Sequence, residues 1–214
     1  MLDICLLGTG GMMPMPSRFL TAMLARLNGR LALIDCGEGT QVTMKMLGWG
    51  FKAIDVICFT HFHADHISGL PGLLLTIGNA GRTEPLMLIG PVGLQRIVEG
   101  LTLIAPELPF SIEYIELTQD APNPISVGAF EIHHCPADHM VKCFAYRIDL
   151  KRKGKFDVKK AERLKLPKPL WNKLQKEGSV EHEGKTYTAD MVMGENRKGI
   201  SVAYCTDSRP VDRI

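Results

Sequence analysis

The sequence predicts a layered α/β protein, because stretches with a strand pattern alternate with stretches with a helix pattern along the chain. A second observation supports this class. A group of His and Asp residues directly follows a short buried strand, where open α/β sheets place their ligand sites. The 214 residues are 45% hydrophobic and 22% charged, which is enough apolar material for one core, or for one domain with an insertion.

The expected strands are short apolar runs bounded by Gly, Pro or charged residues. They cover residues 2–7, 19–27, 30–34, 55–59, 85–89, 111–117, 129–134, 143–148 and 199–205. Asn28-Gly29 lies between two of these runs and predicts a hairpin. Helices are expected at 41–47, in the stretch that ends at 77, and at 91–103 with Pro91 in the first turn. The two prolines in 118–124 predict a loop.

Gly8-Thr-Gly-Gly11 follows the first strand. A phosphate-binding turn would need Gly-x-Gly-x-x-Gly opening a helix, and this segment lacks that spacing. Pro14 and Pro16 also oppose a helix here. We therefore expect a tight turn.

Four metal-ligand side chains lie within six residues, in the order His61, His63, Asp65 and His66. In an extended segment residues two apart point the same way, so His61 and His63 are expected to converge on one ion. Asp65 and His66 follow the turn and are expected to face a second. Imidazole and carboxylate suit zinc, with manganese and iron as alternatives. A pair of surface histidines in a polar loop is the competing interpretation, and the density of ligands argues against it.

Asp35 ends a strand beside a glycine turn. Two roles are open for its carboxylate. It either accepts a hydrogen bond from a ligating imidazole, or it caps the following helix.

The His61–His66 stretch resembles the signature of the metallo-β-lactamase superfamily, and three further segments resemble its ribonuclease Z family. They are Leu6–Gly11, Leu33–Gln41 and Tyr204–Pro210. The resemblance implies an αββα sandwich of two sheets with helices outside. It also implies a cytoplasmic, homodimeric endonuclease that binds two zinc ions and trims the 3′ trailer from precursor tRNA.

The resemblance assigns His139 and Asp207 to the metal centre. His133 and His134 compete with His139 on composition alone, but they lie within a predicted strand, whereas His139 lies in a loop beside an acid. The implied ligands of the first ion are His61, His63, His139 and Asp207. Those of the second are Asp65, His66 and the bridging Asp207, one ligand short. Asp65 is the residue expected to orient the attacking water or to take its proton.

Residues 151–176 hold eleven Lys or Arg and two acidic residues, a net charge of +9 in a chain of formal net charge +2. A solvated surface is the ordinary interpretation of such a run. The resemblance instead implies an inserted arm at about 151–198 that grips tRNA. Its substrate-binding candidates are Lys155, Lys159, Lys160, Lys165 and Lys168.

The resemblance also implies that the family's last metal ligand and a histidine assisting the leaving oxygen lie beyond Ile214. We therefore expect residues 1–214 to form a single metallo-β-lactamase-type domain that lacks its C-terminal part. A signal peptide and a membrane span are not expected, and the six scattered cysteines suggest reduced thiols. Two other functions stay open: another hydrolase on this scaffold, such as a small-molecule phosphodiesterase, thioesterase or lactonase, and a non-catalytic nucleic-acid binder.

Overall fold

The computed structural model describes residues 1–105, 107–152 and 154–212. Of the eleven basic residues counted in 151–176, Lys153 lies outside this description. The chain divides into two compact units. Unit 1 comprises Met1–Asp149 and Ser201–Ile214, and unit 2 comprises Leu150–Ile200.

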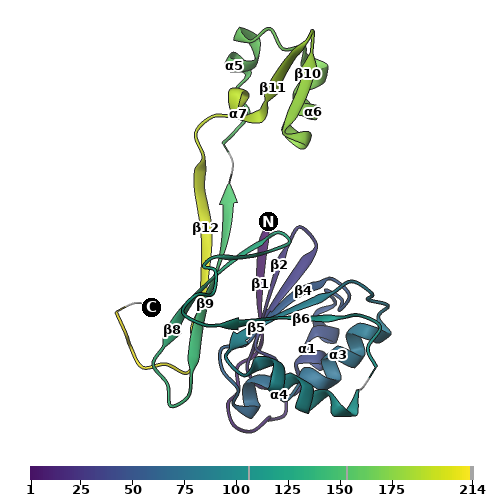
Figure 1. The fold of residues 1–214 in the computed structure, drawn as a ribbon, viewed down its shortest axis with the longest axis vertical. Helices are drawn as coiled ribbons and strands as arrows, with labels where there is room; N and C mark the ends of the chain where they lie inside the picture. Colours follow the sequence, from purple (N-terminus) through teal and green to yellow (C-terminus); the bar gives the residue numbers. More distant parts are fainter. Residues whose placement is uncertain (106, 153, 213–214) are drawn as a thin grey trace. The chain divides into compact units, whose positions relative to one another are not determined.

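Unit 1 contains a six-stranded sheet in the order β1-β2-β3-β4-β5-β6 (Figure 1). The strands are β1 (Leu2–Gly8), β2 (Ala22–Leu27), β3 (Arg30–Ile34), β4 (Ile54–Cys58), β5 (Leu86–Pro91) and β6 (Ile112–Leu117). The first three pair antiparallel, and β3 to β6 pair parallel. The predicted hairpin at Asn28-Gly29 is confirmed, and both residues have the positive φ that a type I′ turn requires, 51° and 80°.

Helices α1 (Thr40–Leu47), α3 (Leu70–Asn79) and α4 (Leu94–Leu101) lie together beside this sheet, and the one-turn helices α2 (Ala64–Ile67) and η1 (Thr102–Ile104) complete the set in unit 1 (Figure 1). Their apolar faces share one buried cluster with alternate strand residues. The cluster includes Leu24, Leu33, Ile57, Leu73, Ile77, Leu88 and Val98. Across the described residues, no helix is long and apolar enough to span a membrane.

The expected start of the helix at Pro91 is wrong. β5 continues through Pro91, and α4 begins at Leu94 after Gly93, whose φ of 98° ends the extended segment. Pairing between β4 and β5 stops at Ile89, so the missing N–H of Pro91 leaves no gap on that side.

A second sheet has the order β12-β9-β8-β7. Its strands are β7 (Ile125–Val127), β8 (Phe130–Ala137), β9 (Cys143–Arg152) and β12 (Arg197–Tyr204). Strand β7 was not predicted. The Tyr146 hydroxyl donates to the Phe59 carbonyl at 2.8 Å, and the Phe144 amide donates to the Thr60 carbonyl at 2.9 Å. These bonds join the two sheets, so helix, sheet and sheet follow in the layer order that was expected.

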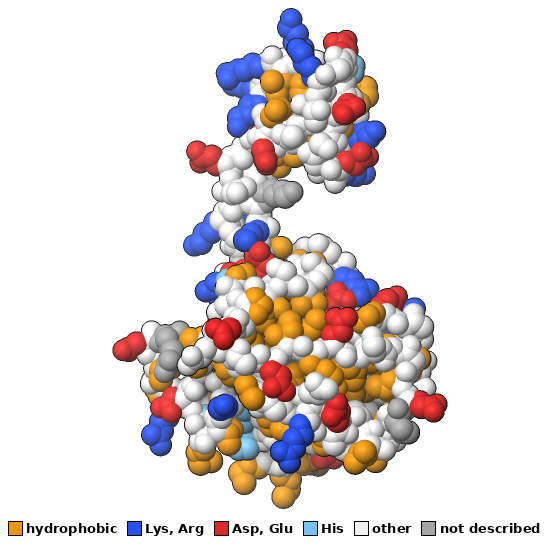
Figure 2. All heavy atoms as spheres, viewed as in Figure 1, with side chains coloured by type: hydrophobic (Ala, Val, Ile, Leu, Met, Phe, Trp, Pro, Cys, Tyr) orange, Lys and Arg blue, Asp and Glu red, His pale blue; other side chains and the backbone are white. Residues whose placement is uncertain are grey.

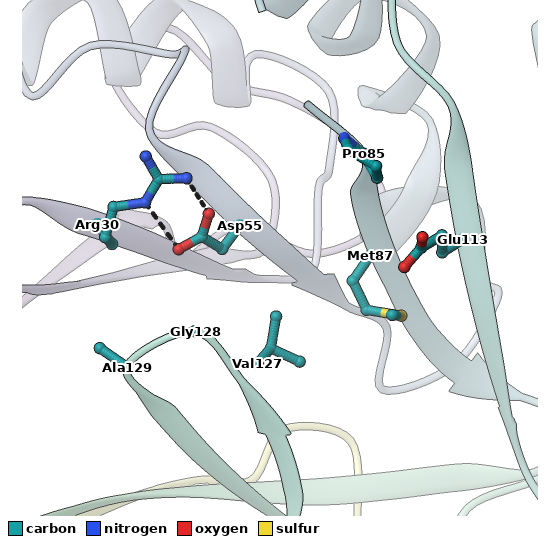
Figure 3. A pocket seen from close by; sticks show the side chains of 8 residues that line it. All are labelled: Arg30, Asp55, Pro85, Met87, Glu113, Val127, Gly128 and Ala129. Carbon is teal, nitrogen blue, oxygen red and sulfur yellow. Dashed lines mark hydrogen bonds and ion pairs between the residues drawn. The ribbon is translucent and has the colours of Figure 1, made fainter. Parts of the chain in front are cut away.

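The two sheets also meet where β4 begins, around a pocket of about 330 Å³ (Figure 3). Arg30 holds Asp55 with two hydrogen bonds, one of them 2.8 Å from Nε to Oδ2. The turn at Gly128 approaches the same carboxylate. Nearby, the buried Arg82 donates to the main-chain carbonyls of Lys52, Ile54, Glu84 and Pro85. The charged groups of Arg30, Asp55 and Arg82 at this end of unit 1 are therefore all hydrogen-bonded.

Unit 2 contains α5 (Val158–Arg163), α6 (Lys168–Glu177), the hairpin β10 (Ser179–His182) with β11 (Lys185–Thr188), and α7 (Ala189–Val192). It has a small core of its own, made by Ala161, Leu166, Leu174, Val180 and Val192. The Trp171 indole donates to the Leu166 carbonyl at 2.8 Å. Lys and Arg side chains stand out on its surface (Figure 2).

Glycines let the loops of unit 1 approach one another closely. A Cβ on Gly8 would lie 1.6 Å from the Leu20 carbonyl oxygen, and one on Gly37 would lie 2.3 Å from the Asp65 carbonyl oxygen. The tight turn expected over Gly8–Gly11 is wrong: Gly8 ends β1, Gly10 bridges to Leu20, and the chain bends after them, at residues 12–13. Gly37 packs directly against the segment that carries the predicted ligands.

We expect Gly37→Ala to destabilise the protein by about 1–3 kcal/mol, because the new methyl group would overlap main-chain atoms that cannot rotate away. Chemical denaturation measures the change. Gly100→Ala is the matched control: nothing lies within 4 Å of its added Cβ, within helix α4. That variant should gain roughly 0.5–1 kcal/mol. Equal stability of the two variants would contradict the close packing.

Candidate metal centre

The segment Thr60–His66 leaves the carboxyl end of β4, which is flanked on both sides by parallel strands. This position buries His61 and His66, which are 0% and 1% exposed. His63 precedes the one-turn helix α2, and Asp65 lies in its first turn. The local fold therefore brings the motif to one edge of the sheet.

Four side chains converge at this edge: His61, His63, His139 and Asp207. One ligand atom from each lies within 4.8 Å of the others. His63 Nδ1 is 3.0 Å from His61 Nε2 and 3.3 Å from His139 Nε2. His61 Nε2 is 3.8 Å from Asp207 Oδ2. Three imidazole nitrogens and a carboxylate oxygen that face one another form a donor set for a divalent metal.

Asp207 also lies close to the second predicted group. Its Oδ2 is 3.5 Å from His66 Nε2, which in turn is 4.0 Å from Asp65 Oδ2. The Met12 amide donates to Asp65 Oδ2 at 2.9 Å and holds that carboxylate in place. The structure thus brings Asp65, His66 and Asp207 together beside the first cluster.

Asp35 supports the histidines and does not cap a helix. Its Oδ2 is 2.8 Å from His66 Nδ1, and its Oδ1 accepts the Thr60 amide at 2.8 Å. Helix α1 begins after Gly39 with no side-chain cap. The open choice is therefore decided for the hydrogen bond to an imidazole.

Electrostatics favour the metal-binding forms of His61 and Asp65. Burial, reinforced by the charges of His66 and His63, lowers the pKa of His61 to about 4. His61 is therefore neutral near pH 7 and has a lone pair to offer. Burial alone would raise the pKa of Asp65, but the Met12 amide and the neighbouring His66 outweigh it and lower the pKa. Asp65 is consequently ionised.

Comparison with known proteins identifies the family. A ribonuclease Z from Lachnospira eligens is 57% identical over 214 residues, which are 100% of this chain and 70% of that protein. This chain belongs to the ribonuclease Z family. A ribonuclease Z from Clostridium acetobutylicum is 53% identical over 219 residues, again covering 100% of this chain and 71% of that protein.

Solved structures agree on the fold. The human tRNase Z short form is 30% identical with a TM-score of 0.60, over 69% of this chain and 64% of that one. The metallo-β-lactamase fold protein YhfI from Bacillus subtilis is 20% identical with a TM-score of 0.57, over 69% of this chain and 57% of that one. The predicted metallo-β-lactamase fold is confirmed, and fold and family together imply a divalent metal. A family model described as Anti-Pycsar protein Apyc1 also matches residues 2–98.

The competing histidines lie away from the cluster. His133 Nε2 is 3.0 Å from Asp149 Oδ2, and His134 Nε2 is 3.2 Å from the Pro122 carbonyl. Among the lysines predicted to bind substrate, Lys155, Lys159, Lys165 and Lys168 are exposed. Lys160 is half-buried and donates to the Met193 carbonyl at 2.7 Å, which ties α5 to α7.

Sequence reasoning gave no role to Met12, Thr60 or Cys143. Met12 acts through its main-chain amide, so its residue type carries no signal. Cys143 Sγ lies 3.8 Å from His61 Nδ1, but 82 positions separate the two residues. No local pattern reports such a contact.

We expect His139→Ala to weaken divalent-metal binding strongly. Loss of a residue that only supports a metal ligand lowers metal affinity by about 10- to 100-fold, and loss of a ligand itself should lower it further. Elemental analysis after dialysis measures the bound metal. His133→Ala is the control. It also removes one imidazole, but the side chain of His133 contacts Asp149 and lies outside the metal cluster. Equal metal content in the two variants would count against the cluster.

Proposed function

We propose that this protein is a zinc-dependent endoribonuclease that removes the 3′ trailer from precursor tRNA. One observation carries the proposal: relatives named ribonuclease Z are 57% identical along the entire chain, so the likeness includes both the metal centre and unit 2. The similarity to a solved human tRNase Z at 30% identity supports the same substrate.

The proposed centre holds two zinc ions. His61, His63, His139 and Asp207 bind the first, and Asp65, His66 and Asp207 contribute to the second. Bound zinc supplies a water of lowered pKa and positive charge beside the phosphoryl oxygens. Asp207 lies between the groups, with one oxygen 3.8 Å from His61 and 3.5 Å from His66, which suits a bridging carboxylate.

Asp65 is the proposed proton acceptor. It is ionised, and the Met12 amide fixes its Oδ2. It also lines a pocket of about 390 Å³ with Gly10, Gly11, Tyr204 and Asp207. A phosphodiester bound there would place the attacking water beside this carboxylate. The products are a tRNA with a 3′-hydroxyl and a trailer with a 5′-phosphate.

Unit 2 is the proposed tRNA-binding arm, corresponding to about residues 151–198. The exposed Lys155, Lys159, Lys165 and Lys168 provide positive charge on a folded surface. Contacts of this kind to phosphates give affinity without reading sequence. That suits an enzyme whose substrates share a shape and differ in sequence.

The alternative is a phosphodiesterase that acts on a small molecule. This alternative rests on the metal centre alone, because the His61–His66 motif suits hydrolases of different substrates. The match to the Apyc1 family model covers residues 2–98, which include that whole motif. That match does not extend to unit 2. Cleavage of precursor tRNA, compared with cleavage of bis(p-nitrophenyl) phosphate, separates the two functions.

We expect the triple variant Lys155→Gln, Lys159→Gln, Lys168→Gln to bind precursor tRNA more weakly and with a shallower salt dependence. Each lost phosphate contact lowers the salt slope by about one. Filter binding across a salt series measures both quantities. Hydrolysis of bis(p-nitrophenyl) phosphate should persist, because that diester needs only the metal centre.

The control removes the same charge from unit 1, as Lys45→Gln, Lys52→Gln, Arg96→Gln, all at exposed positions. It should leave the salt slope closer to wild type. Asp65→Ala should do the reverse of the arm variant: tRNA still binds, and neither substrate is cut. If the arm variant binds tRNA with unchanged affinity and unchanged salt dependence, the basic run does not bind tRNA and is only a solvated surface.

We also propose that the protein is a homodimer, as the family resemblance implies. Light scattering at micromolar concentration should give twice the protomer mass. A monomer that cleaves precursor tRNA at the full rate would refute the dimer.

A further inference from the structure

Thr60 is a buried residue whose hydroxyl lies within hydrogen-bonding distance of several side chains of the metal centre. Its side chain is fully inaccessible to solvent. Its hydroxyl oxygen lies 2.8 Å and 3.1 Å from the two carboxylate oxygens of Asp35, 3.1 Å from His61 Nδ1 and 3.4 Å from His66 Nδ1. One hydroxyl thus touches a carboxylate and two predicted metal ligands.

Counting protons decides the direction of these bonds. A hydroxyl has one hydrogen to donate and lone pairs to accept. Asp35 Oδ1 already accepts the Thr60 amide, and the Thr60 hydroxyl donates its hydrogen to Asp35 Oδ2 at 2.8 Å, the shortest of the four distances. The Thr60 lone pairs then face His61 Nδ1, which must be the donor. His61 therefore carries its hydrogen on Nδ1, and its Nε2 is free toward the cluster.

His66 receives the same tautomer directly. Its Nδ1 lies 2.8 Å from Asp35 Oδ2, and among the described residues its acceptors are that carboxylate and the more distant Thr60 oxygen. Donation from Nδ1 leaves His66 Nε2 facing Asp207 at 3.5 Å. A single buried carboxylate thus orients two imidazoles.

The other neighbour of His61 Nδ1 is a poor substitute for Thr60. Cys143 Sγ lies 3.8 Å away, and sulfur is a weak acceptor. Thr60 is the strong acceptor that the described residues provide for this nitrogen.

We propose that Thr60 is a positioning residue that relays the acceptor character of Asp35 to His61. In this way one carboxylate sets the metal-binding tautomer of a histidine in each of the two proposed zinc positions. The inference rests on the proposed metal centre and adds to it a residue that is neither ligand nor proton acceptor.

The backbone conformation of Asp35 and the hydrogen bonds of its carboxylate hold this side chain in one position. Its φ is 59°, a left-handed conformation that is uncommon for a residue other than glycine. The Thr60 amide holds Oδ1, and His66 holds Oδ2. The carboxylate therefore has no freedom to turn toward His61, and the Thr60 hydroxyl covers the remaining distance.

The test compares zinc affinity, measured by competition with a chromophoric chelator, in three variants. Thr60→Val keeps the shape and removes the hydroxyl, and should weaken zinc binding by about 10- to 100-fold, as loss of a supporting partner does. Thr60→Ser keeps the hydroxyl and should bind zinc nearly as wild type. Thr40→Val is the control, since Thr40 is equally buried and its hydroxyl donates to the Gly37 carbonyl.

A second measurement needs no destabilising variant. In zinc-loaded wild type labelled with ¹⁵N-histidine, long-range ¹H–¹⁵N spectra should show His61 protonated on Nδ1. Thr60→Ser should preserve that signal. Protonation on Nε2 would overturn the proposal, as would a Thr60→Val protein that binds zinc as tightly as wild type.

The outcomes separate this inference from the proposed function. Protein that takes up no zinc would end both. Protein that binds zinc with the expected variant order but leaves precursor tRNA uncut would end the proposed substrate and keep the role of Thr60. If Thr60→Val binds zinc as tightly as wild type, only the positioning role of Thr60 is refuted.

Discussion

The buried carboxylate of Asp35 is the interaction on which the metal centre depends. A carboxylate removed from water is costly unless donors surround it, and here a main-chain amide, a hydroxyl and an imidazole do so. The parallel pairing of β3 with β4 makes this arrangement available, because it places Asp35 beside Thr60 at the same sheet edge. The contact between Asp35 and the histidine segment thus follows from strand pairing.

The second sheet contributes two further ligands to the centre. His139 follows β8 and Asp207 follows β12, and both reach the histidines that follow β4 in the other sheet. Only a sandwich with the correct sheet-to-sheet contact brings these ligands within range. The bonds from Tyr146 to Phe59 and from Phe144 to Thr60 fasten the sheets directly beside the motif. Fold stability and metal geometry therefore share the same contacts.

Sequence reasoning succeeds where the signal lies within a few residues. The hairpin at Asn28-Gly29 and the ligands from His61 to His66 have such local patterns, whereas His139 and Asp207 were assigned through family resemblance. Sequence reasoning fails where the conformation or role of a residue depends on residues far away in the chain. Pro91 was placed in a helix because its role at the end of β5 depends on where pairing with β4 stops. Thr60 had no assigned role because its acceptor, Asp35, lies 25 positions earlier.

The distribution of charge gives a physical reason for two units in the proposed enzyme. Residues 151–176 carry +9, so with a total of +2 the rest of the chain carries −7. A mildly acidic body repels a polyanion on average, and the basic run must supply the attraction. The small core around Leu174 and Val180 presents these lysines on a folded surface, which reduces the entropy lost on binding. The metal centre then needs to recognise no more than a phosphodiester. This explains why the same His-x-His-x-Asp-His motif suits hydrolases of different substrates, and why substrate choice has to be sought in unit 2.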